Sequence, residues 1–358
     1  MSFGLDCVPG MAVVAAFERN AWACETHAAN MAAPVVGCDV AGIRSFNTVL
    51  GGLGVRRVDV LAGGPPCQGF SKLGKGALRK MALSDGRRVD IEDERNWLFR
   101  HFIRAVRELS PQVVLMENVP ELLRYGSIVE ELRDVFKELG YTFDHRVLHA
   151  EKHGVPQRRR RLFMVANKHG LQVPWPDEKR RVRERTLHDA IGDLPEVPPM
   201  QLEEELTWIM PGRTAPYLKE MRRGMRGAAA RIVRDHVTRF HGEKDVAAFR
   251  YMMEGDMYGS VPEELRRYRS DIFADKYHRM VWNRPAWTVT AHIAKDGYKY
   301  IHPEQHRTIS VREAARIQSF PDRFRFAGSR THRFTQIGNA VPPKLATALG
   351  TALLPLIR

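Results

Sequence analysis

The sequence lacks the segments that mark membrane and secreted proteins. No stretch of its 358 residues approaches the ~20 consecutive apolar residues of a membrane span. The opening residues, MSFGLDCVPGMAVV, lack the basic segment that begins a secretory signal. The four cysteines show no CxxC pairing, so neither a zinc site nor a disulfide framework is indicated. We find no internal repeat, and we expect a soluble, intracellular protein without a metal site.

Acidic residues are also in deficit. The chain holds 56 Lys and Arg against 42 Asp and Glu, a net charge of +14, and its hydrophobic fraction of 44% excludes a disordered or fibrous chain. A positive surplus of this size favours a polyanionic partner. The basic residues gather in runs at 157–162, 178–185, 221–234 and 264–269. This clustering favours nucleic acid over evenly solvated charge.

The first half of the chain alternates short apolar runs with amphipathic segments. Helical spacing of apolar residues predicts helices over 98–109 and 129–140, the second of which ends at Gly140. The apolar runs predict strands over 11–18, 58–64, 112–118 and 162–167. This order predicts a doubly wound, Rossmann-like α/β fold, in which a parallel sheet carries helices on both faces. Ligands of such sheets bind at the C-terminal ends of the strands.

The texture of the sequence changes at about residue 168. Prolines become frequent there and the strand–helix rhythm stops. At roughly 100–200 residues per domain, the length of the chain suggests two domains. We predict a first domain over 1–167, a second, smaller and irregular domain over 168–305, and a C-terminal segment over 306–358 that returns to the first.

One cysteine stands in a setting suited to chemistry. In GGPPCQGFS an apolar strand runs into two glycines and two prolines and then presents Cys67. Prolines fix the backbone ahead of the sulfur, and glycines permit a tight turn. Most free cysteines are small buried hydrophobes, the role we assign to Cys7, Cys24 and Cys38. Cys67 is instead a candidate nucleophile, which needs a nearby cation or hydrogen bond to form its thiolate.

A carboxylate and a run of arginines accompany two further strands. Glu117, in MENVP, ends an apolar strand; alone it would cap the following turn, but beside Cys67 it could polarise a ring nitrogen while the thiol adds to the ring. In GVPQRRRRLF four arginines open another strand. Because a strand alternates faces, Arg159 and Arg161 are expected to share one face. Plain solvated charge is the alternative interpretation.

Five motifs, in this order, resemble the DNA cytosine-5 methyltransferases: PPCQGFS, ENV, QRRRR, REAARIQSFPD and QIGNAVPP. The resemblance spans nearly the whole chain. It implies that Cys67 attacks C6 of a cytosine and that Glu117 holds ring N3. It also implies that Arg159 and Arg161 hold the catalytic pocket and the base. The methyl group would pass from S-adenosylmethionine to C5 of a cytosine in a specific duplex sequence, after the base is flipped out of the helix.

The same resemblance implies a cofactor site. An acidic residue at the end of the second strand commonly takes ribose hydroxyls, and Glu18 stands at such an end. Asp39 resembles the adenine-contacting aspartate of the family. The full set of expected cofactor contacts is Glu18, Asp39, Pro66, Leu98 and Asn339.

Expected DNA contacts follow from the family as well. Gln68 and Ser71 lie in a loop, 68–90, that would close over the flipped base. The second predicted domain occupies the place of the family's target-recognition domain, and its stretch PAWTVTAHI carries Thr288 and Thr290. The expected partner is double-stranded DNA, bound by a monomer in the bacterial cytoplasm or nucleoid and away from membranes.

The beginning of the chain departs from the family pattern. The family opens with D-L-F-x-G-x-G-G, a strand and a Gly-rich loop, whereas this chain begins with MSFGLD, which resembles the helix after that loop. We therefore expect a sheet without its central strand and further residues encoded upstream of Met1. Two alternatives are a cytosine-5 methyltransferase acting on transfer RNA, disfavoured by the long basic insert, and an inactive DNA-binding module.

Overall fold

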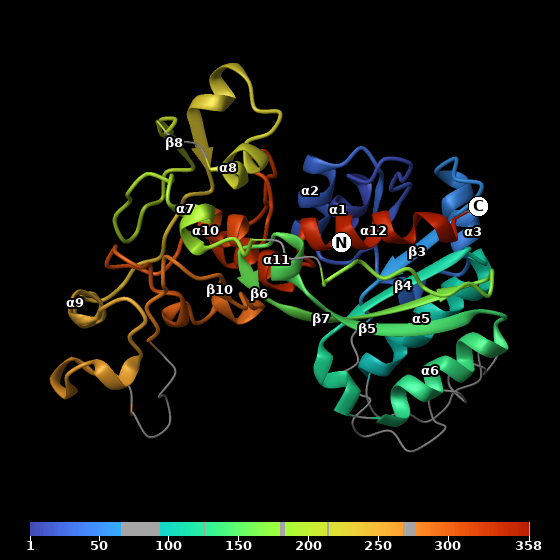
Figure 1. The fold of residues 1–358 in the computed structure, drawn as a ribbon. Coiled ribbons are helices and arrows are strands. Elements are labelled where there is room, and N and C mark those ends of the chain that lie inside the picture. Colours follow the sequence, from blue (N-terminus) through green and yellow to red (C-terminus); the bar gives the residue numbers. More distant parts are fainter. Residues whose placement is uncertain are drawn as a thin grey trace.

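The computed structural model of the protein describes residues 1–65, 94–124, 126–179, 183–212, 215–267, 269 and 277–357. These residues form two lobes that lie side by side (Figure 1). We call the described residues of 1–179 together with 341–357 the sheet lobe, and those of 183–340 the second lobe. Among the described residues, no helix is both long enough and apolar enough to cross a bilayer.

Four of the residues predicted to act on cofactor or DNA lie outside the described residues. They are Pro66, Cys67, Gln68 and Ser71. Their roles stay predictions.

A four-stranded sheet forms the centre of the sheet lobe. Its order is β3 (Val60–Gly63), β4 (Val113–Asn118), β7 (Arg160–Asn167) and β5 (Thr142–His149). β3 and β4 run parallel, as predicted, but β7 runs antiparallel to both β4 and β5. The expectation of a parallel sheet is therefore wrong for β7. Only about ten residues join β5 to β7, whereas a parallel neighbour needs a crossover of about a dozen or more.

Helices cover both faces of this sheet. The predicted helices are present as α5 (Glu94–Leu109) and α6 (Gly126–Glu138), whose apolar side chains pack on one face. The chain leaves α6 through Gly140, whose φ of +80° lies in the left-handed region that favours glycine. On the other face, α1 (Ser2–Asp6) packs against α12 (Pro343–Leu353). Gly4 permits this approach, because a Cβ there would lie 2.4 Å from the Pro343 carbonyl oxygen.

The sheet is divided. β1 (Ala16–Glu18) and β2 (Val35–Gly37) form a separate parallel pair, connected through α2 (Ala21–Asn30). Of the predicted strand 11–18, only the last three residues are strand. Among the described residues no strand pairs with both β1 and β3; the expectation of a missing central strand stays a prediction.

A small apolar cluster connects the β1–β2 pair to the rest of the lobe. Phe17 of β1 meets Phe46 of α3 (Phe46–Gly52) edge-on, with ring centroids 5.6 Å apart. Leu61 of β3 and Ala105 of α5 belong to the same cluster. Side-chain packing therefore joins β1 to β3 where backbone pairing does not.

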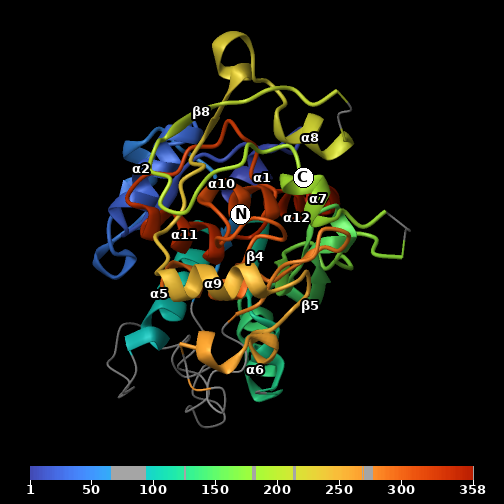
Figure 2. The ribbon, with the colours of Figure 1, turned by 90° about the vertical axis from the view of Figure 1, so that its left-hand side faces the viewer.

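The second lobe consists of short elements. They are α7 (Leu187–Ile191), β8 (Glu205–Thr207), α8 (Pro216–Met221), β9 (Ile232–Arg234), α9 (Glu243–Tyr251), β10 (Ala286–Trp287), α10 (Val311–Ile317) and α11 (Arg330–Asn339). Figure 2 faces this lobe and shows β8 towards one end and α9 nearer the other. β10 pairs in parallel with β6 (Gln157–Arg158), which leads from the sheet lobe. α10 and α11 pack in the second lobe and α12 returns to the sheet lobe; the predicted three-part division of the chain stays a prediction.

Candidate active site and ligand cavity

A buried ion pair lies where β4 and β7 run side by side. Arg161 Nε is 2.9 Å from Glu117 Oε1, and the two side chains are 13% and 16% exposed. Burial raises the pKa of Glu117, while the charges of Arg161 and Arg159 act in the opposite direction. A raised pKa favours the protonated form, in which a carboxyl group can donate to a ring nitrogen. We call Glu117 and Arg161 the buried ion pair.

The segment that leads to Cys67 begins against this pair. A Cβ on Gly64 would lie 3.2 Å from Glu117 Oε2, so only glycine allows the carboxylate this close without a shift. Asn118 Nδ2 donates to the Pro65 carbonyl oxygen at 3.0 Å. The last two described residues before Pro66 and Cys67 are therefore fixed beside the carboxyl group that is expected to act with the thiol.

Arg159 has a different place from Arg161. Exposure alternates along 157–161 as a strand predicts, with Arg159 fully buried and Arg158 and Arg160 exposed. The Arg159 guanidinium donates to three backbone carbonyls, those of Val289 at 2.6 Å, Gly338 at 2.9 Å and Ala340 at 3.0 Å. Burial lowers its pKa to about 9. Arg159 thus joins the two lobes beside the buried ion pair.

A cavity of about 660 Å³ opens between the two pieces of the sheet. Its wall includes the whole length of β1 and β3, the residues that precede each of these strands, the residues after β2 and one face of α5. Three of the predicted cofactor contacts, Glu18, Asp39 and Leu98, line it, and Asn339 does not. The volume falls in the range of about 300–1,000 Å³ that is usual for ligand sites.

The two cavity carboxylates also serve the local backbone. Glu18 accepts from the Asn20 N–H at 2.8 Å, and Asp39 accepts from the Ala41 N–H at 2.9 Å. Arg19 lies 3.7 Å from Asp39. A carboxylate has two oxygens and about four acceptor positions, so each can cap a turn and still accept from a ligand hydroxyl or amine.

Several cavity residues were not singled out from the sequence. They are mainly apolar: Phe17, Val40, His101 and Phe102. Val40 follows Asp39, and His101 and Phe102 come one helical turn after Leu98, so spacing from the predicted contacts could have found them. Burial and nearby arginines lower the pKa of His101. Apolar walls between two carboxylates suit a ligand with an aromatic base, hydroxyls and a positive charge.

The two predicted DNA-contacting threonines lie on either side of a buried valine. Thr288 Oγ1 donates to the Arg158 carbonyl oxygen at 2.8 Å, whereas Thr290 is exposed. Val289 between them is fully buried. We call Thr288 and Thr290 the threonine pair; its contact with DNA stays a prediction.

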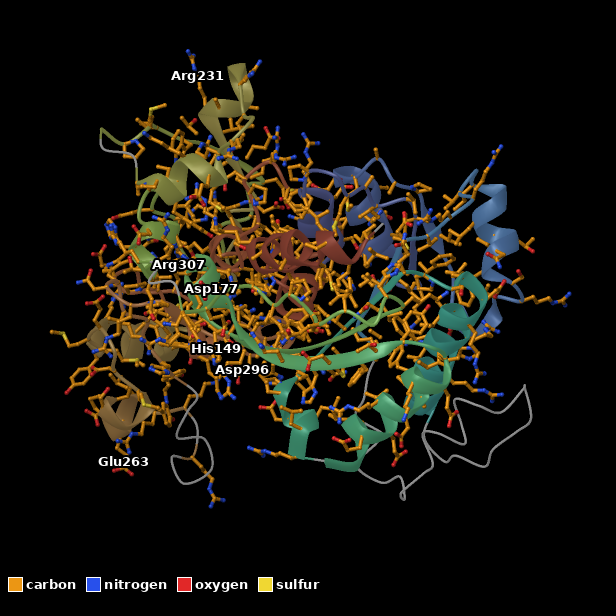
Figure 3. All side chains as sticks on the ribbon, turned by 45° about the vertical axis from the view of Figure 1, so that its right-hand side comes forward. His149, Asp177, Arg231, Glu263, Asp296 and Arg307 are labelled. Atoms are coloured by element: carbon orange, nitrogen blue, oxygen red, sulfur yellow. The ribbon has the colours of Figure 1, made fainter. Side chains whose placement is uncertain are left out.

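The basic run 221–234 contains two kinds of arginine. Arg222 is structural, because it donates to Asp322 at 2.8 Å and its guanidinium lies 3.7 Å from the Trp208 ring centroid. Arg223, Arg226 and Arg231 are exposed. Figure 3 shows Arg231 and Glu263 at opposite ends of the second lobe. The described residues hold no cluster of three or more His, Cys, Asp or Glu that could bind a metal ion.

Known proteins resemble the chain over nearly its whole length. It is 32% identical over 371 residues to the type II methyltransferase M.XorII of Xanthomonas oryzae pv. oryzae, a match that covers 98% of this chain and 81% of the relative. It is 34% identical over 328 residues to the type II methyltransferase M.Bpa9945I of Bacillus paralicheniformis, with 84% and 71% covered.

Solved structures show the same fold. A prophage-encoded protein from E. coli, described as a DNA modification methyltransferase, superposes with a TM-score of 0.75 at 25% identity, covering 99% of this chain and 94% of the other. The S. pombe Dnmt2 methyltransferase superposes with a TM-score of 0.56 at 16% identity, covering 99% and 95%, which is a likeness of fold. The model of the C-5 cytosine-specific DNA methylase family matches residues 1–354. The chain therefore belongs to this family and is a DNA cytosine-5 methyltransferase.

Proposed function

We propose that the enzyme methylates C5 of a flipped-out cytosine in one duplex DNA sequence through a covalent bond between Cys67 and C6. The observation that carries the proposal is the buried ion pair beside Gly64 and Pro65, where the strand leading to Cys67 ends. The thiol of Cys67, two residues beyond Pro65, would then lie near the carboxyl group of Glu117.

Residues of this chain assist the first step of the reaction, the addition to the ring. The thiolate of Cys67 adds to C6, and the electron pair of the C5–C6 bond moves into the ring, where Glu117 stabilises it by hydrogen bonding or protonating N3. Arg161 holds Glu117 in place at 2.9 Å and supplies positive charge at the base. C5 then takes the methyl group. Loss of the C5 proton and of the thiolate restores the aromatic ring.

S-adenosylmethionine, the donor implied by the family, fits the cavity by chemistry. Glu18 and Asp39 can accept from the ribose hydroxyls and the adenine amine, and Leu98 and Phe102 provide apolar wall. When bound, it supplies a sulfonium methyl group. The residues of this chain would orient it at the C-terminal edge of the sheet, on the side where β3 approaches Glu117.

Duplex DNA would lie against both lobes. The net charge of +14 and the exposed arginines of the run 221–234 suit a phosphate backbone. The threonine pair reaches the same junction of lobes as Arg159. We infer that a monomer binds one site, in the compartment that holds the DNA, and that the second lobe chooses the sequence.

A trapping experiment tests the proposal. Duplex DNA carrying 5-fluorocytosine cannot lose the substituent at C5, so wild-type protein with S-adenosylmethionine should form an adduct that survives denaturing gels. Cys67→Ala should form none. Adduct formed by Cys67→Ala, or methyl transfer by that variant at the wild-type rate, would show that another residue is the nucleophile.

Two controls separate substrate and role. Transfer RNA in place of duplex DNA should accept no tritiated methyl group; preferred labelling of RNA would favour the alternative substrate. Glu117→Gln keeps the size of the side chain and its place beside Arg161 but cannot donate a proton to N3. It should lower the rate of methyl transfer by about 10²–10⁴-fold while the affinity for S-adenosylmethionine stays the same.

A further inference from the structure

A polar cluster of three fully buried side chains, Gln157, Arg159 and Gln318, joins the two lobes. They come from β6, from the residue between β6 and β7, and from the end of α10. Figure 1 shows β6 and β10 at the junction of the lobes. Buried polar groups are costly unless they are hydrogen-bonded, so the partners of these side chains indicate what the cluster holds.

The cluster bonds both backbone polar groups of one residue of the second lobe, Val289. The N–H of Val289 donates to Gln157 Oε1 at 2.8 Å, and its carbonyl oxygen accepts from Arg159 Nη1 at 2.6 Å. The pairing of β6 with β10 stops at Trp287, two residues earlier. Beyond that point, the two side chains take the place of a neighbouring strand.

Gln318 supports the orientation of Gln157, together with the carbonyl group of Ile317 at 3.3 Å. A backbone N–H can only donate, so Gln157 must turn its oxygen towards Val289 and its NH₂ group away. That NH₂ group donates to Gln318 Oε1 at 3.0 Å, and the NH₂ group of Gln318 donates to the Ile337 carbonyl oxygen at 2.7 Å. Gln318 therefore acts on Val289 through Gln157.

These hydrogen bonds connect two parts of the proposed DNA site. The threonine pair flanks Val289, and Arg161 of the buried ion pair lies two residues beyond Arg159. Thr288 and Thr290 are the direct neighbours of Val289 in the chain. A shift of the Val289 backbone would therefore move both threonines relative to Arg161.

We propose that Gln157 and Gln318 are positioning residues for methyl transfer, whose paired carboxamides hold the threonine pair in register with the buried ion pair. The inference rests on the proposed function, since it takes the target cytosine to lie between these two groups. A misplacement of about 1 Å can cost about a hundredfold in rate. The effect belongs to the rate of the bound complex, because the cofactor cavity lies elsewhere in the sheet lobe.

Single-turnover methyl transfer, at saturating DNA and S-adenosylmethionine, measures that rate. Gln157→Met and Gln318→Met keep the volume but remove the hydrogen bonds, and each should lower the rate at least about tenfold with an unchanged calorimetric affinity for S-adenosylmethionine. The matched control is Gln112→Met, which removes a glutamine bonded to Asp59 at 2.8 Å in the same lobe. Its single-turnover rate should equal that of wild type. Equal rates for all three variants and wild type would overturn the proposal.

Gln157→Glu gives a second readout that a purely structural role would not move. A protonated glutamate reproduces the carboxamide: its carbonyl oxygen accepts from Val289, and its O–H donates to Gln318. Burial favours the neutral carboxyl group and the nearby Arg159 guanidinium favours the charged one. With burial as the larger effect, as it is for Glu117 beside Arg161, the activity of the variant relative to wild type should rise as the pH falls from about 8 to about 6. A ratio that does not change with pH would overturn the proposal. Failure of the proposed function would be seen separately, as wild-type protein without methyl transfer to duplex DNA.

Discussion

The interior of the sheet lobe is apolar on both faces of the sheet, with Val114, Leu132 and Phe163 among its fully buried side chains, whereas the interior of the second lobe is crowded with ions. Four arginines there, Arg279, Arg307, Arg312 and Arg316, are at most 2% exposed. Of the described buried polar side chains, only Thr26, Gln157, Arg159 and Asn167 come from the sheet lobe.

The difference follows from how each lobe satisfies its backbone. Paired strands and helices bond their own N–H and C=O groups, but short irregular elements leave carbonyl groups that need other donors. Arg279 donates to the carbonyls of His302 at 2.7 Å and Pro303 at 3.0 Å, and Arg312 donates to that of Phe324 at 2.9 Å. A guanidinium carries five donors, so one side chain can replace several ladder bonds. The second lobe therefore adds buried guanidinium groups to apolar clusters of its own, whereas the interior of the sheet lobe is almost wholly apolar.

The largest change in stability is expected when one buried arginine of the second lobe is removed. Arg316 is fully buried between Asp193 and Asp322, with its Nη2 2.7 Å from Asp322 Oδ2. Arg316→Met leaves Asp193 without its guanidinium and Asp322 with that of Arg222 alone, and it should lower the free energy of unfolding by about 3–5 kcal/mol. Chemical denaturation measures it. Adding Asp322→Asn should recover part of the loss; a purely additive double variant would contradict the ion-pair explanation.

The next largest effect is expected from acid, which should destabilise the second lobe before the sheet lobe. Burial lowers the pKa of His302 to about 3 and that of His241 to about 4, both in the second lobe. Below pH 6.5, the ordinary pKa of histidine, the unfolded chain therefore binds protons at these two histidines that the folded lobe does not. Each histidine should cost up to about 1.4 kcal/mol per pH unit as the pH falls from there towards its folded value. Fluorescence of Trp282 and Trp287 should change before that of Trp175; simultaneous change would contradict the assignment.

Bound cofactor should stabilise the sheet lobe. S-adenosylmethionine at a hundred times its Kd should raise the free energy of unfolding by about 2.7 kcal/mol, and the gain should appear in the sheet lobe, whose residues line the cavity. Glu18→Gln and Asp39→Asn should shrink the thermal shift, because each loses negative charge at the ligand. An undiminished shift in both variants would place the cofactor elsewhere.

The smallest expected change in stability distinguishes exposed from buried arginines. Arg223→Ala with Arg226→Ala should alter stability by no more than about 0.5 kcal/mol. The double variant should nevertheless lower the slope of log K for DNA against log salt by about 0.9 for each phosphate that it no longer neutralises. Arg222→Ala should instead destabilise the lobe through Asp322 and Trp208. An unchanged salt slope in the double variant would show that Arg223 and Arg226 are solvated surface residues that contact no phosphate.

The sequence could predict elements whose apolar pattern is regular. The strands over 58–64, 112–118 and 162–167 and both predicted helices are confirmed within a few residues. β5 was missed, because Asp144, His145 and Arg146 interrupt its apolar pattern in a strand at the edge of the sheet. The direction of β7 depends on the length of its connection rather than on its composition.

Charge was the least informative signal at the level of single residues. The net charge of +14 favoured nucleic acid as a partner. A run of arginines in the sequence, however, does not distinguish a guanidinium that faces DNA from one that bonds carbonyl groups inside the fold. Arg222 and Arg223 are neighbours with opposite surroundings. The partners of Glu117 and Arg159 likewise come from distant segments, so only the structure places them.

The division of the sheet has a consequence for the motions of its strands. β4 is paired on both sides, by β3 and β7, whereas in the described residues β1 and β3 each have one strand neighbour and a cavity on the other side. Amide protons directed at that cavity can meet solvent through local opening, while those of β4 need a far larger rearrangement. Hydrogen exchange should therefore be slowest in β4, faster in β3 and fastest in β1. A ligand that fills the cavity would slow the last two without changing the first.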